Sequence, residues 1–307
     1  MNLLVWNCRG LGNLRTEKEL GNIIRAKDPS VMFLAETWAD EARLDRVLHN
    51  INFDHKWEVP SGRRGGGLVL FWKRDVNVTI EDSHRYFIDV TFDKNMEAEW
   101  RFTGFYGEPE THRRMEAWNK LRGLNNRPSI SWLCAGDFNE ISRQDEKMGG
   151  VLRGHNQMQM FRDVIDECGF IDLGFEGPKF TWSKHFSDGH SIWERLDRGL
   201  ANSEFLLKYP GAKVSHLRSM SSDYVPIFIN LSGLETPPKK KVFRFEEMWL
   251  SDSGCGETVE AVWRNGEEGD ILKKIEKCSK DLEWWEKNCF GNVRRELEEK
   301  KKIASKS

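Results

Sequence analysis

Short apolar runs separated by polar turns recur along the chain up to about residue 231. Runs of about four to eight apolar residues bounded by turn residues are typical of buried strands. The predicted strands are 2–8, 31–36, 67–72, 76–80, 86–92, 99–106, 130–136, 179–183, 213–217 and 226–231. Apolar residues at helical spacing predict helices between some of them, at 16–27, 40–51, 112–124 and 155–168. Many strands with interspersed helices favour a layered α/β domain over a helical bundle.

The pattern changes after residue 234. Residues 235–241 have the composition of a linker, with two prolines followed by three lysines. Residues 270–303 then show a helical period, interrupted or bent at Gly291. Its apolar positions are Ile271, Ile275, Cys278, Leu282, Trp285, Cys289, Val293 and Leu297. We therefore expect a domain over 1–234, a linker over 235–241, and a helical segment over 242–307 whose apolar face needs a partner surface that the chain does not obviously supply.

The run Gly65-Gly66-Gly67 lies between Arg63-Arg64 and a predicted strand. No Gly-Lys-Ser or Gly-Lys-Thr follows, and a P-loop would lead into a helix. The run therefore predicts a hairpin turn, with a phosphate-cradling turn as the alternative.

The composition provides the side chains of a hydrophobic core, and the net charge is small. Among 307 residues, 38% are hydrophobic, and thirteen Trp and eighteen Phe supply bulky core side chains. The net charge of −2 gives no overall attraction for nucleic acid. Local basic clusters remain as candidates for such a surface, or as ordinary solvated positions: Arg63-Arg64, Lys73-Arg74, Arg113-Arg114, and Arg195 with Arg198.

Cysteine usage and the N-terminus indicate a reducing, intracellular setting. The six Cys form no C-x-x-C pair, and several lie in apolar runs. The N-terminus lacks the features of a secretory signal, and no apolar run approaches the length of a membrane span. We expect a soluble protein. The lysines of 239–241 are too few to count as a nuclear import signal.

Candidate chemistry begins where the apolar run Trp132-Leu133-Cys134-Ala135 ends in Gly136-Asp137-Phe138-Asn139. Side chains two apart on a strand share a face, so Asp137 and Asn139 are expected to point the same way. Such a pair suits phosphate chemistry, in which an acid activates a water and an amide binds a phosphate oxygen. An ordinary polar strand exit is the alternative.

Other predicted strands also end in polar side chains. Asn7 follows the first apolar run, and Glu36 follows the second. Asp197 and Asp223 come later in the chain, within Leu196-Asp197-Arg198 and Ser222-Asp223. Each alone is a common strand terminus, but the ordered set predicts one site at the edge of a sheet.

With these residues the sequence resembles the endonuclease/exonuclease/phosphatase family, which includes DNase I-like nucleases and apurinic endonucleases. Within it, the sequence is most similar to the N-terminal endonuclease of plant LINE-type (non-LTR) retrotransposon polyproteins. The motifs that carry the resemblance are Trp6-Asn7-Cys8-Arg9-Gly10, Leu34-Ala35-Glu36-Thr37, Gly104-Phe105-Tyr106-Gly107, Ala135-Gly136-Asp137-Phe138-Asn139-Glu140, Phe180-Thr181-Trp182-Ser183, Leu196-Asp197-Arg198 and Ser222-Asp223. Residues 242–303 look like the connector before the reverse transcriptase of such polyproteins, which does not follow here.

The resemblance implies a four-layer αββα sandwich and cleavage of a DNA phosphodiester with Mg²⁺, or Mn²⁺ as an alternative. Residue by residue, it implies these roles: Glu36 as the main metal ligand, helped by Asn7, with Asp223 near the metal; Asp137 activating water; Asn139 and Tyr106 contacting phosphate; Thr181 on the substrate-facing rim; Ser222 and Asn7 binding substrate; and Asp197 orienting the catalytic imidazole. Mg²⁺ commonly binds through only one or two carboxylates, with waters and substrate phosphate completing its shell.

One position departs from the family pattern, Ser-Asp-His-x-Pro. This chain has Ser222-Asp223-Tyr224-Val225-Pro226. Imidazole titrates near neutral pH, whereas phenol has a pKa of about 10 and cannot supply positive charge. Tyr224 is therefore expected to weaken or abolish DNA cleavage. His185 and His190 lie close in sequence and are an alternative source of an imidazole.

The sequence is compatible with three functions. They are a weakened Mg²⁺-dependent endonuclease that nicks duplex DNA, a non-catalytic DNA- or protein-binding relic, and a phosphatase of phosphoinositides or sphingolipids on the same fold. A DNA substrate implies nuclear action, and no obligate protein partner can be inferred. Most Trp near strands, namely Trp38, Trp72, Trp132 and Trp182, are expected in the core, and Trp193 is the better candidate for touching nucleic acid.

Overall fold

The computed structural model describes residues 1–60, 66–125, 130–219, 222–233, 245, 247–265 and 271–290. The chain divides into two compact units, Met1–Pro237 and Pro238–Ser307. The predicted linker, residues 235–241, lies outside the described residues. Each unit is described by itself.

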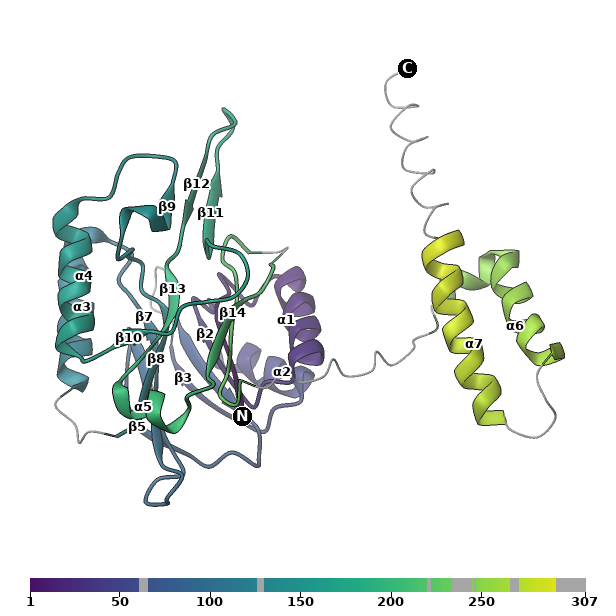
Figure 1. Ribbon diagram of the computed structural model, residues 1–307, viewed down its shortest axis with the longest axis horizontal. Coiled ribbons are helices and arrows are strands. Elements are labelled where there is room, and N and C mark those ends of the chain that lie inside the picture. The colour runs from purple at the N-terminus through teal and green to yellow at the C-terminus, as the bar shows by residue number, and fades with distance from the viewer. Residues whose placement is uncertain are drawn as a thin grey trace. The chain divides into compact units, whose positions relative to one another are not determined.

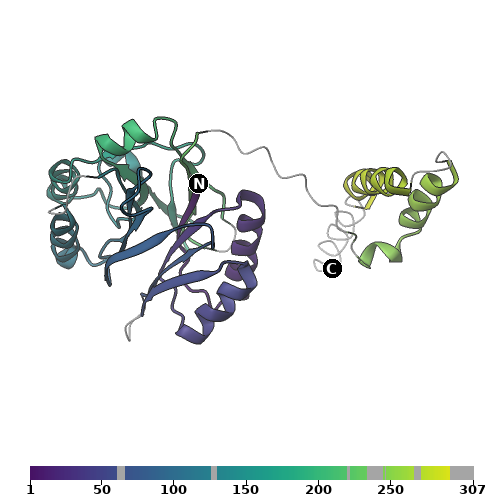
Figure 2. The same ribbon diagram turned by 90° about the horizontal axis from the view of Figure 1, so that it is seen from below.

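The first sheet of the larger unit is built around two parallel strands, β1 (Asn2–Asn7) and β2 (Val31–Ala35). All other neighbours in this sheet are antiparallel. Its order is β14 (Lys213–His216), β15 (Ile227–Asn230), β1, β2, β4 (Leu68–Trp72), β3 (His55–Val59). Helices α1 (Leu14–Lys27) and α2 (Glu41–Ile51) cover its outer face (Figure 2).

The second sheet has the same plan, with parallel β7 (Trp100–Tyr106) and β8 (Trp132–Asp137) at its centre. Its order is β10 (Ile171–Asp172), β13 (Asp197–Ala201), β8, β7, β6 (Phe87–Phe92), β5 (Val78–His84). Helices α3 (Arg114–Leu124) and α4 (His155–Glu167) cover its outer face, and a short helix α5 (Ser203–Lys208) follows β13 (Figure 1). A hairpin of β11 (Trp182–His185) and β12 (Ser191–Glu194), extended by β9 (Lys147–Met148), projects from one end of the sheets (Figure 1).

Three apolar layers hold the larger unit together. The two sheets face each other, as Figure 2 shows, over a core that includes Val5, Phe33 and Phe102. Alternate residues of the same strands, such as Leu4 and Trp6, point outward to α1 and α2. Sheet contact is close at Gly104, where an added Cβ would lie 2.3 Å from the Phe33 ring. These layers confirm the predicted αββα sandwich.

The ten predicted strands and four predicted helices are all found, with shifted ends. The prediction missed β3, β9, β10, β12 and β13, as well as α5. Strands β12 and β13 were missed because Glu194, Arg195 and Arg198 interrupt any apolar alternation. Strands β3 and β4 pair as antiparallel neighbours on either side of residues 60–67, in keeping with the predicted hairpin, although residues 61–65 lie outside the described part.

The smaller unit contains α6 (Ser253–Asn265), α7 (Ile271–Trp285), a 3₁₀ turn (Glu247–Ser251) and a π-helical turn (Glu286–Phe290). Trp249, Cys255, Leu282 and Trp285 form its buried core. Part of the predicted apolar face of α7, at Cys278, Leu282 and Trp285, packs in this core, whereas Ile271 and Ile275 of the same face are 65% and 53% exposed. Gly291, Val293 and Leu297 lie outside the described residues. Among the described helices, none is both long and apolar enough to cross a membrane.

Candidate active site

The carboxyl ends of the two parallel strand pairs meet at one edge of the sandwich. Asn7 is level with Ala35 across β1 and β2, and Tyr106 is level with Asp137 across β7 and β8. This register brings Asn7, Glu36, Tyr106 and Asp137 together, although up to 130 residues separate them in sequence. The predicted convergence at a sheet edge is therefore present in the structure.

Asn7 lies at the centre of this cluster. Its Nδ2 donates to Glu36 Oε1 and to Asp137 Oδ2, each at 2.8 Å. The Tyr106 hydroxyl donates to the same Glu36 oxygen at 3.0 Å. One amide and one phenol thus hold two carboxylates close to each other.

Asn139 secures the turn after β8. Its backbone N–H donates to Asp137 Oδ1 at 2.8 Å, and its side-chain Nδ2 donates to the Gly107 carbonyl at 2.8 Å. Asn139 has a left-handed backbone, with φ of +53°, and Glu36 has one with φ of +52°. Such values are uncommon outside glycine and cluster at functional sites. Both residues sit in turns that aim polar groups at the edge.

The enclosure of Asp137 changes its acidity. Burial, the largest cause, and the charge of Glu36 raise the pKa of Asp137 to about 7, against hydrogen bonds from Asn7 and the Asn139 N–H that lower it. Burial followed by the charges of Glu36 and Asp137 also raises the pKa of Tyr106, which therefore remains a proton donor. A carboxylate poised near neutral pH suits a general base.

The same residues fit a hard divalent cation. Asn7 Oδ1 is buried, and among the described residues it has no hydrogen-bond partner. The Nδ2 of the same amide is bonded to Glu36 and Asp137, so this free oxygen lies within one amide group of two carboxylates. The described part of the chain holds no cluster of three or more His, Cys, Asp and Glu suited to a metal. Mg²⁺ does not require one, because it keeps several waters.

Asp197 lies directly opposite Asp137 in the pairing of β13 with β8. It is fully buried, and neither of its carboxylate oxygens has a hydrogen-bond partner within the described residues. Burial first, then the charge of Asp137, raises the pKa of Asp197 well above its usual range. A buried polar group without a partner is costly, so this carboxyl needs an explanation.

Tyr224 is close enough to Asp197 for the charge of this acid to act on its phenol. Its side chain is buried, and its ring lies 6.4 Å from that of Trp182. Burial first, and then the charges of Asp137, Glu36 and Asp197, raise the pKa of Tyr224. The phenol is therefore neutral at physiological pH and makes no hydrogen bond to Asp197.

Thr181 differs from the expected rim position. It is fully buried, and its Oγ1 accepts from the N–H groups of Leu196 and Asp197, both at 2.9 Å. The hydroxyl thus fixes the backbone that carries Asp197 rather than facing solvent. Ser222 Oγ accepts from Tyr224 N–H at 3.1 Å, and Asp223 pairs with Arg9. The substrate role of Ser222 and the metal role of Asp223 remain predictions.

Thr181→Val is expected to lower the free energy of unfolding by about 1–3 kcal/mol, because it leaves two buried N–H groups without an acceptor. Denaturant unfolding measures the change. Thr181→Ser, which keeps the oxygen, is the matched control and should lose less. Equal stability of the Val variant and the native protein would contradict the support role.

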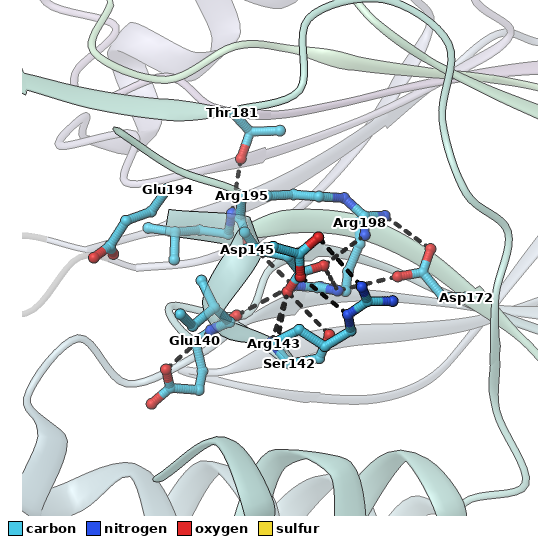
Figure 3. A network of polar contacts seen from close by, with 12 residues as sticks. Glu140, Ser142, Arg143, Asp145, Asp172, Thr181, Glu194, Arg195 and Arg198 are labelled. Carbon is cyan, nitrogen blue, oxygen red and sulfur yellow. Dashed lines mark hydrogen bonds and ion pairs between the residues drawn. The ribbon is translucent and has the colours of Figure 1, made fainter. Parts of the chain in front are cut away.

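A network of opposite charges surrounds Arg198 of β13 (Figure 3). Arg198 is fully buried, and its guanidinium bonds Glu146 Oε2 at 2.9 Å and Asp172 Oδ2 at 3.0 Å. Arg195 bonds the same two acids at 2.9 and 2.8 Å. Although burial alone would raise it, the charge of Arg198 holds the pKa of Glu146 down to about 2. The network ties β13, and hence Asp197, to the loop after Asp137.

Sequence reasoning missed this network. Arg195 and Arg198 were candidates for a nucleic-acid surface or a solvated one, and both interpretations were wrong because the two side chains are buried and paired. Arg114 is also buried, against Glu140. Two arginines that flank Leu196-Asp197, one of them in β13, were the available signal. Arg74 is exposed as expected, and Arg63-Arg64 lies outside the described residues. Trp38, expected in the core, is 49% exposed.

His216 at the end of β14 makes stability depend on pH. Its ring stacks on Phe175 at 4.3 Å, which in turn lies under Arg195, and its Nδ1 contacts the Pro178 carbonyl at 2.7 Å. Burial lowers the pKa of His216 to about 4, opposed by the Pro178 contact, with Arg195 lowering it and Asp172 raising it. The unfolded chain, with a histidine pKa of about 6.5, binds this proton more readily.

Stability from His216 is therefore complete above about pH 6.5 and is lost as pH falls toward about 4, by up to about 3 kcal/mol. Urea unfolding of native protein and His216→Gln from pH 7.5 to 4 checks this. The difference in the free energy of unfolding between the two proteins should become smaller or change sign at low pH, because both proteins share all other titrating groups. Parallel curves would contradict it.

The fold and the edge cluster define a DNase I-like phosphoesterase class. The chain belongs to the Endonuclease/Exonuclease/phosphatase family, whose sequence profile matches residues 4–223. The family comprises hydrolases that include nucleases and phosphatases, and it typically uses a divalent metal. No curated protein matches the sequence.

Solved structures share the fold at low identity. The 3′ phosphatase NExo from Neisseria, bound to product DNA hairpin, is 17% identical with a TM-score of 0.57, covering 75% of this chain and 98% of its own. The AP endonuclease from Archaeoglobus fulgidus is 12% identical with a TM-score of 0.59, covering 75% and 98%. The endonuclease domain of TRAS1, a telomere-specific non-LTR retrotransposon, is 14% identical with a TM-score of 0.52, covering 75% and 97%.

Proposed function

We propose that the chain is a Mg²⁺-dependent endonuclease of a LINE-type retroelement that nicks duplex DNA, with turnover weakened by Tyr224. The family supplies the hydrolase class. The hydrogen-bonded group of Asn7, Glu36, Tyr106 and Asp137 supports a phosphodiester as the substrate, since it pairs a candidate base with a metal-binding oxygen set. Mn²⁺ is the alternative ion.

Glu36 and the free Oδ1 of Asn7 would hold the cation. When bound, Mg²⁺ offsets negative charge on the phosphate and on the leaving oxygen. Asp137 receives the proton of the attacking water, and it is held by two donors, Asn7 Nδ2 and the Asn139 N–H. Tyr106, whose hydroxyl is bonded to Glu36 in the structure, would turn this hydrogen bond to phosphate, and Asn139 is held at the residue after Tyr106 by the bond from its Nδ2 to the Gly107 carbonyl.

The single observation that supports weakened turnover is Asp197, a fully buried acid whose two carboxylate oxygens have no hydrogen-bond partner among the described residues. In the family pattern an imidazole stands at position 224 and bonds this acid. A phenol donates one hydrogen bond but carries no positive charge. Loss of a positioned acid–base group typically costs about 10²–10⁴-fold in rate.

The plant LINE-like motifs support duplex DNA as the partner, and a DNA substrate implies nuclear action. In this proposal the unit after residue 237 is the connector of such a polyprotein. The projecting β11–β12 hairpin carries Trp193, whose half-buried ring lies 5.2 Å from His185. This hairpin is the candidate contact with nucleic acid. A phosphoinositide or sphingolipid phosphatase shares only the fold with this proposal.

A second candidate is a binding relic that has lost turnover altogether. The same unpartnered Asp197 favours it, because the acid has no imidazole to orient. The candidates differ in whether the rest of the site still works.

The test is nicking of supercoiled plasmid by the full chain in Mg²⁺. The proposal expects slow nicking that a chelator stops and that Asp137→Ala lacks. No nicking by the native chain or by a variant with histidine restored at position 224 would favour the relic. Fast nicking by the native chain, lost in Asp137→Ala, would remove the case for weakened turnover.

A further inference from the structure

Arg9 occupies a locked loop beside the candidate metal ligands. It follows β1 by two residues and has a left-handed backbone, with φ of +49°. The Gly10 N–H donates to the Glu36 carbonyl at 2.8 Å, and the Leu11 N–H donates to that of Thr37 at 2.9 Å. Gly10 itself faces the Trp38 ring, where an added Cβ would lie at 2.9 Å. The loop of Arg9 is thus fixed to the loop of Glu36.

The side chain of Arg9 crosses the edge to Asp223, the residue before Tyr224. Its Nη1 pairs with Asp223 Oδ2, and the two side chains are 46% and 54% exposed. Other arginines near this edge differ. Arg114, Arg195 and Arg198 are buried and neutralised by buried acids. Of these four arginines in the described part of the chain, Arg9 combines a loop bonded to that of Glu36 with a half-exposed side chain.

We propose that Arg9 binds the phosphate that is cleaved, and supplies there the positive charge that Tyr224 lacks. The inference rests on the proposed function and names a substrate contact within it. Asp223 then acts as the resting partner that keeps the guanidinium extended across the edge, rather than as a metal ligand.

Physical chemistry favours the exchange of partners. An ion pair half open to solvent is weak, so leaving Asp223 costs little. A guanidinium presents paired N–H donors that match two phosphate oxygens, with stronger hydrogen bonds than neutral donors make. A strained left-handed backbone at an arginine is more readily explained by such a contact than by a surface ion pair, because strain of this kind accumulates at ligand sites.

The first experiment measures the affinity of the full chain for a short duplex in Ca²⁺ over a range of salt concentrations. Each phosphate neutralised contributes about 0.9 to the slope of log affinity against log salt. Arg9→Met should lower that slope by about this amount, and Arg9→Lys should keep it. Arg74→Met is the matched control, because Arg74 is exposed, paired with Asp54, and lies past the opposite end of β4. It should leave the slope unchanged.

A loss in Arg9→Met could also arise from repulsion by the freed Asp223. The double variant Arg9→Met/Asp223→Asn separates the two causes. The proposal expects the lowered slope to persist in it, and a return to the native slope would overturn the proposal. Equal slopes for native protein and Arg9→Met would also overturn it while leaving the endonuclease proposal intact. Absence of any duplex binding by the native chain would instead overturn the proposed function, and the inference with it.

The second experiment locates the phosphate. Thymidine 5′-monophosphate, titrated in Ca²⁺ and followed by phosphorus NMR, is too small to reach distant charges. Arg9→Met should weaken its binding about tenfold or more, the range for a hydrogen bond to a charged group. Glu36→Ala should also weaken it, which places the mononucleotide at the edge cluster. Unchanged affinity in either variant would overturn the assignment.

Discussion

Tyr224→His is expected to raise the rate of plasmid nicking by about 10²–10⁴-fold, the usual contribution of a positioned acid–base group. The reason is that Asp197 offers an unused hydrogen-bond acceptor to a histidine at position 224. Asp197 is fully buried and its two oxygens lack partners among the described residues, so an imidazole N–H at position 224 would find an acceptor already in place. The backbone there is fixed, since Tyr224 bridges to Trp182 and its carbonyl accepts from Trp6 Nε1 at 3.1 Å.

The electrostatic surroundings favour the charged form of that imidazole. Burial is the largest cause of the raised pKa of Tyr224, and the charges of Asp137, Glu36 and Asp197 raise that pKa further. Opposite charges within a few ångströms stabilise an imidazolium. Histidine would therefore bring positive charge to the side of the site where the native chain has a neutral phenol. The proposed contact of Arg9 would supplement this charge rather than replace proton transfer.

The measurement uses supercoiled plasmid, Mg²⁺ and four full-length proteins: native, Tyr224→His, Tyr224→Phe and the double variant Tyr224→His/Asp137→Ala. Only Tyr224→His should gain activity. The Phe variant controls for loss of the phenol alone, and the double variant shows whether any gain depends on Asp137. A gain shared by Tyr224→Phe would mean that the phenol obstructs the site and that imidazole chemistry is not the missing element.

Arg198→Met is expected to lower the free energy of unfolding by about 3–5 kcal/mol, the range for breaking a buried ion pair by removing one partner. For a domain of this size the melting temperature should fall by roughly 6–20 °C. Methionine fills a similar volume without charge, so the substitution leaves little cavity. The loss of stability comes from burying Glu146 and Asp172 with one cationic partner fewer. Arg195 would remain to pair with both acids, which sets the lower end of the range.

Urea unfolding and thermal melting check this at pH 7, with Arg143→Ala as the control. Arg143 is 73% exposed and pairs with Asp145 in the same region of the chain, so its removal should change stability by less than about 1 kcal/mol. Similar losses in both variants would contradict a buried network that carries stability. Because β13 also bears Asp197, a destabilised Arg198→Met protein should nick poorly even with histidine at position 224.

Much of the fold followed from local pattern. Apolar runs bounded by Gly, Pro and Asp predicted ten strands, since a strand buried on both faces needs little more than such a run. The site followed from the same logic. Asn7, Glu36 and Asp137 come directly after such runs, and parallel pairing brings carboxyl ends to one edge. The departure at Tyr224 was also visible, because the residues around it match the family pattern.

Whether each charged side chain is buried or exposed depended on tertiary structure. Arg195, Arg198 and Thr181 read as surface or rim residues because local sequence does not report what covers a side chain. The loop after Asp137 and the β10 strand supply Glu146 and Asp172, which make burial of two guanidiniums tolerable. The pairing of Arg9 with Asp223 joins residues 214 positions apart. Likewise, part of the apolar face of α7 is covered because α6 packs against it.

Sequence by itself thus determined ten of the strands, the polar ends that form the site, the family and the tyrosine at position 224, since each depends on neighbours within a few residues. Only the tertiary structure decided which charges are buried, which acid stands without a partner and which arginine faces the open edge. Those outcomes depend on desolvation and on pairing between distant segments, and both of these are properties of the packed chain.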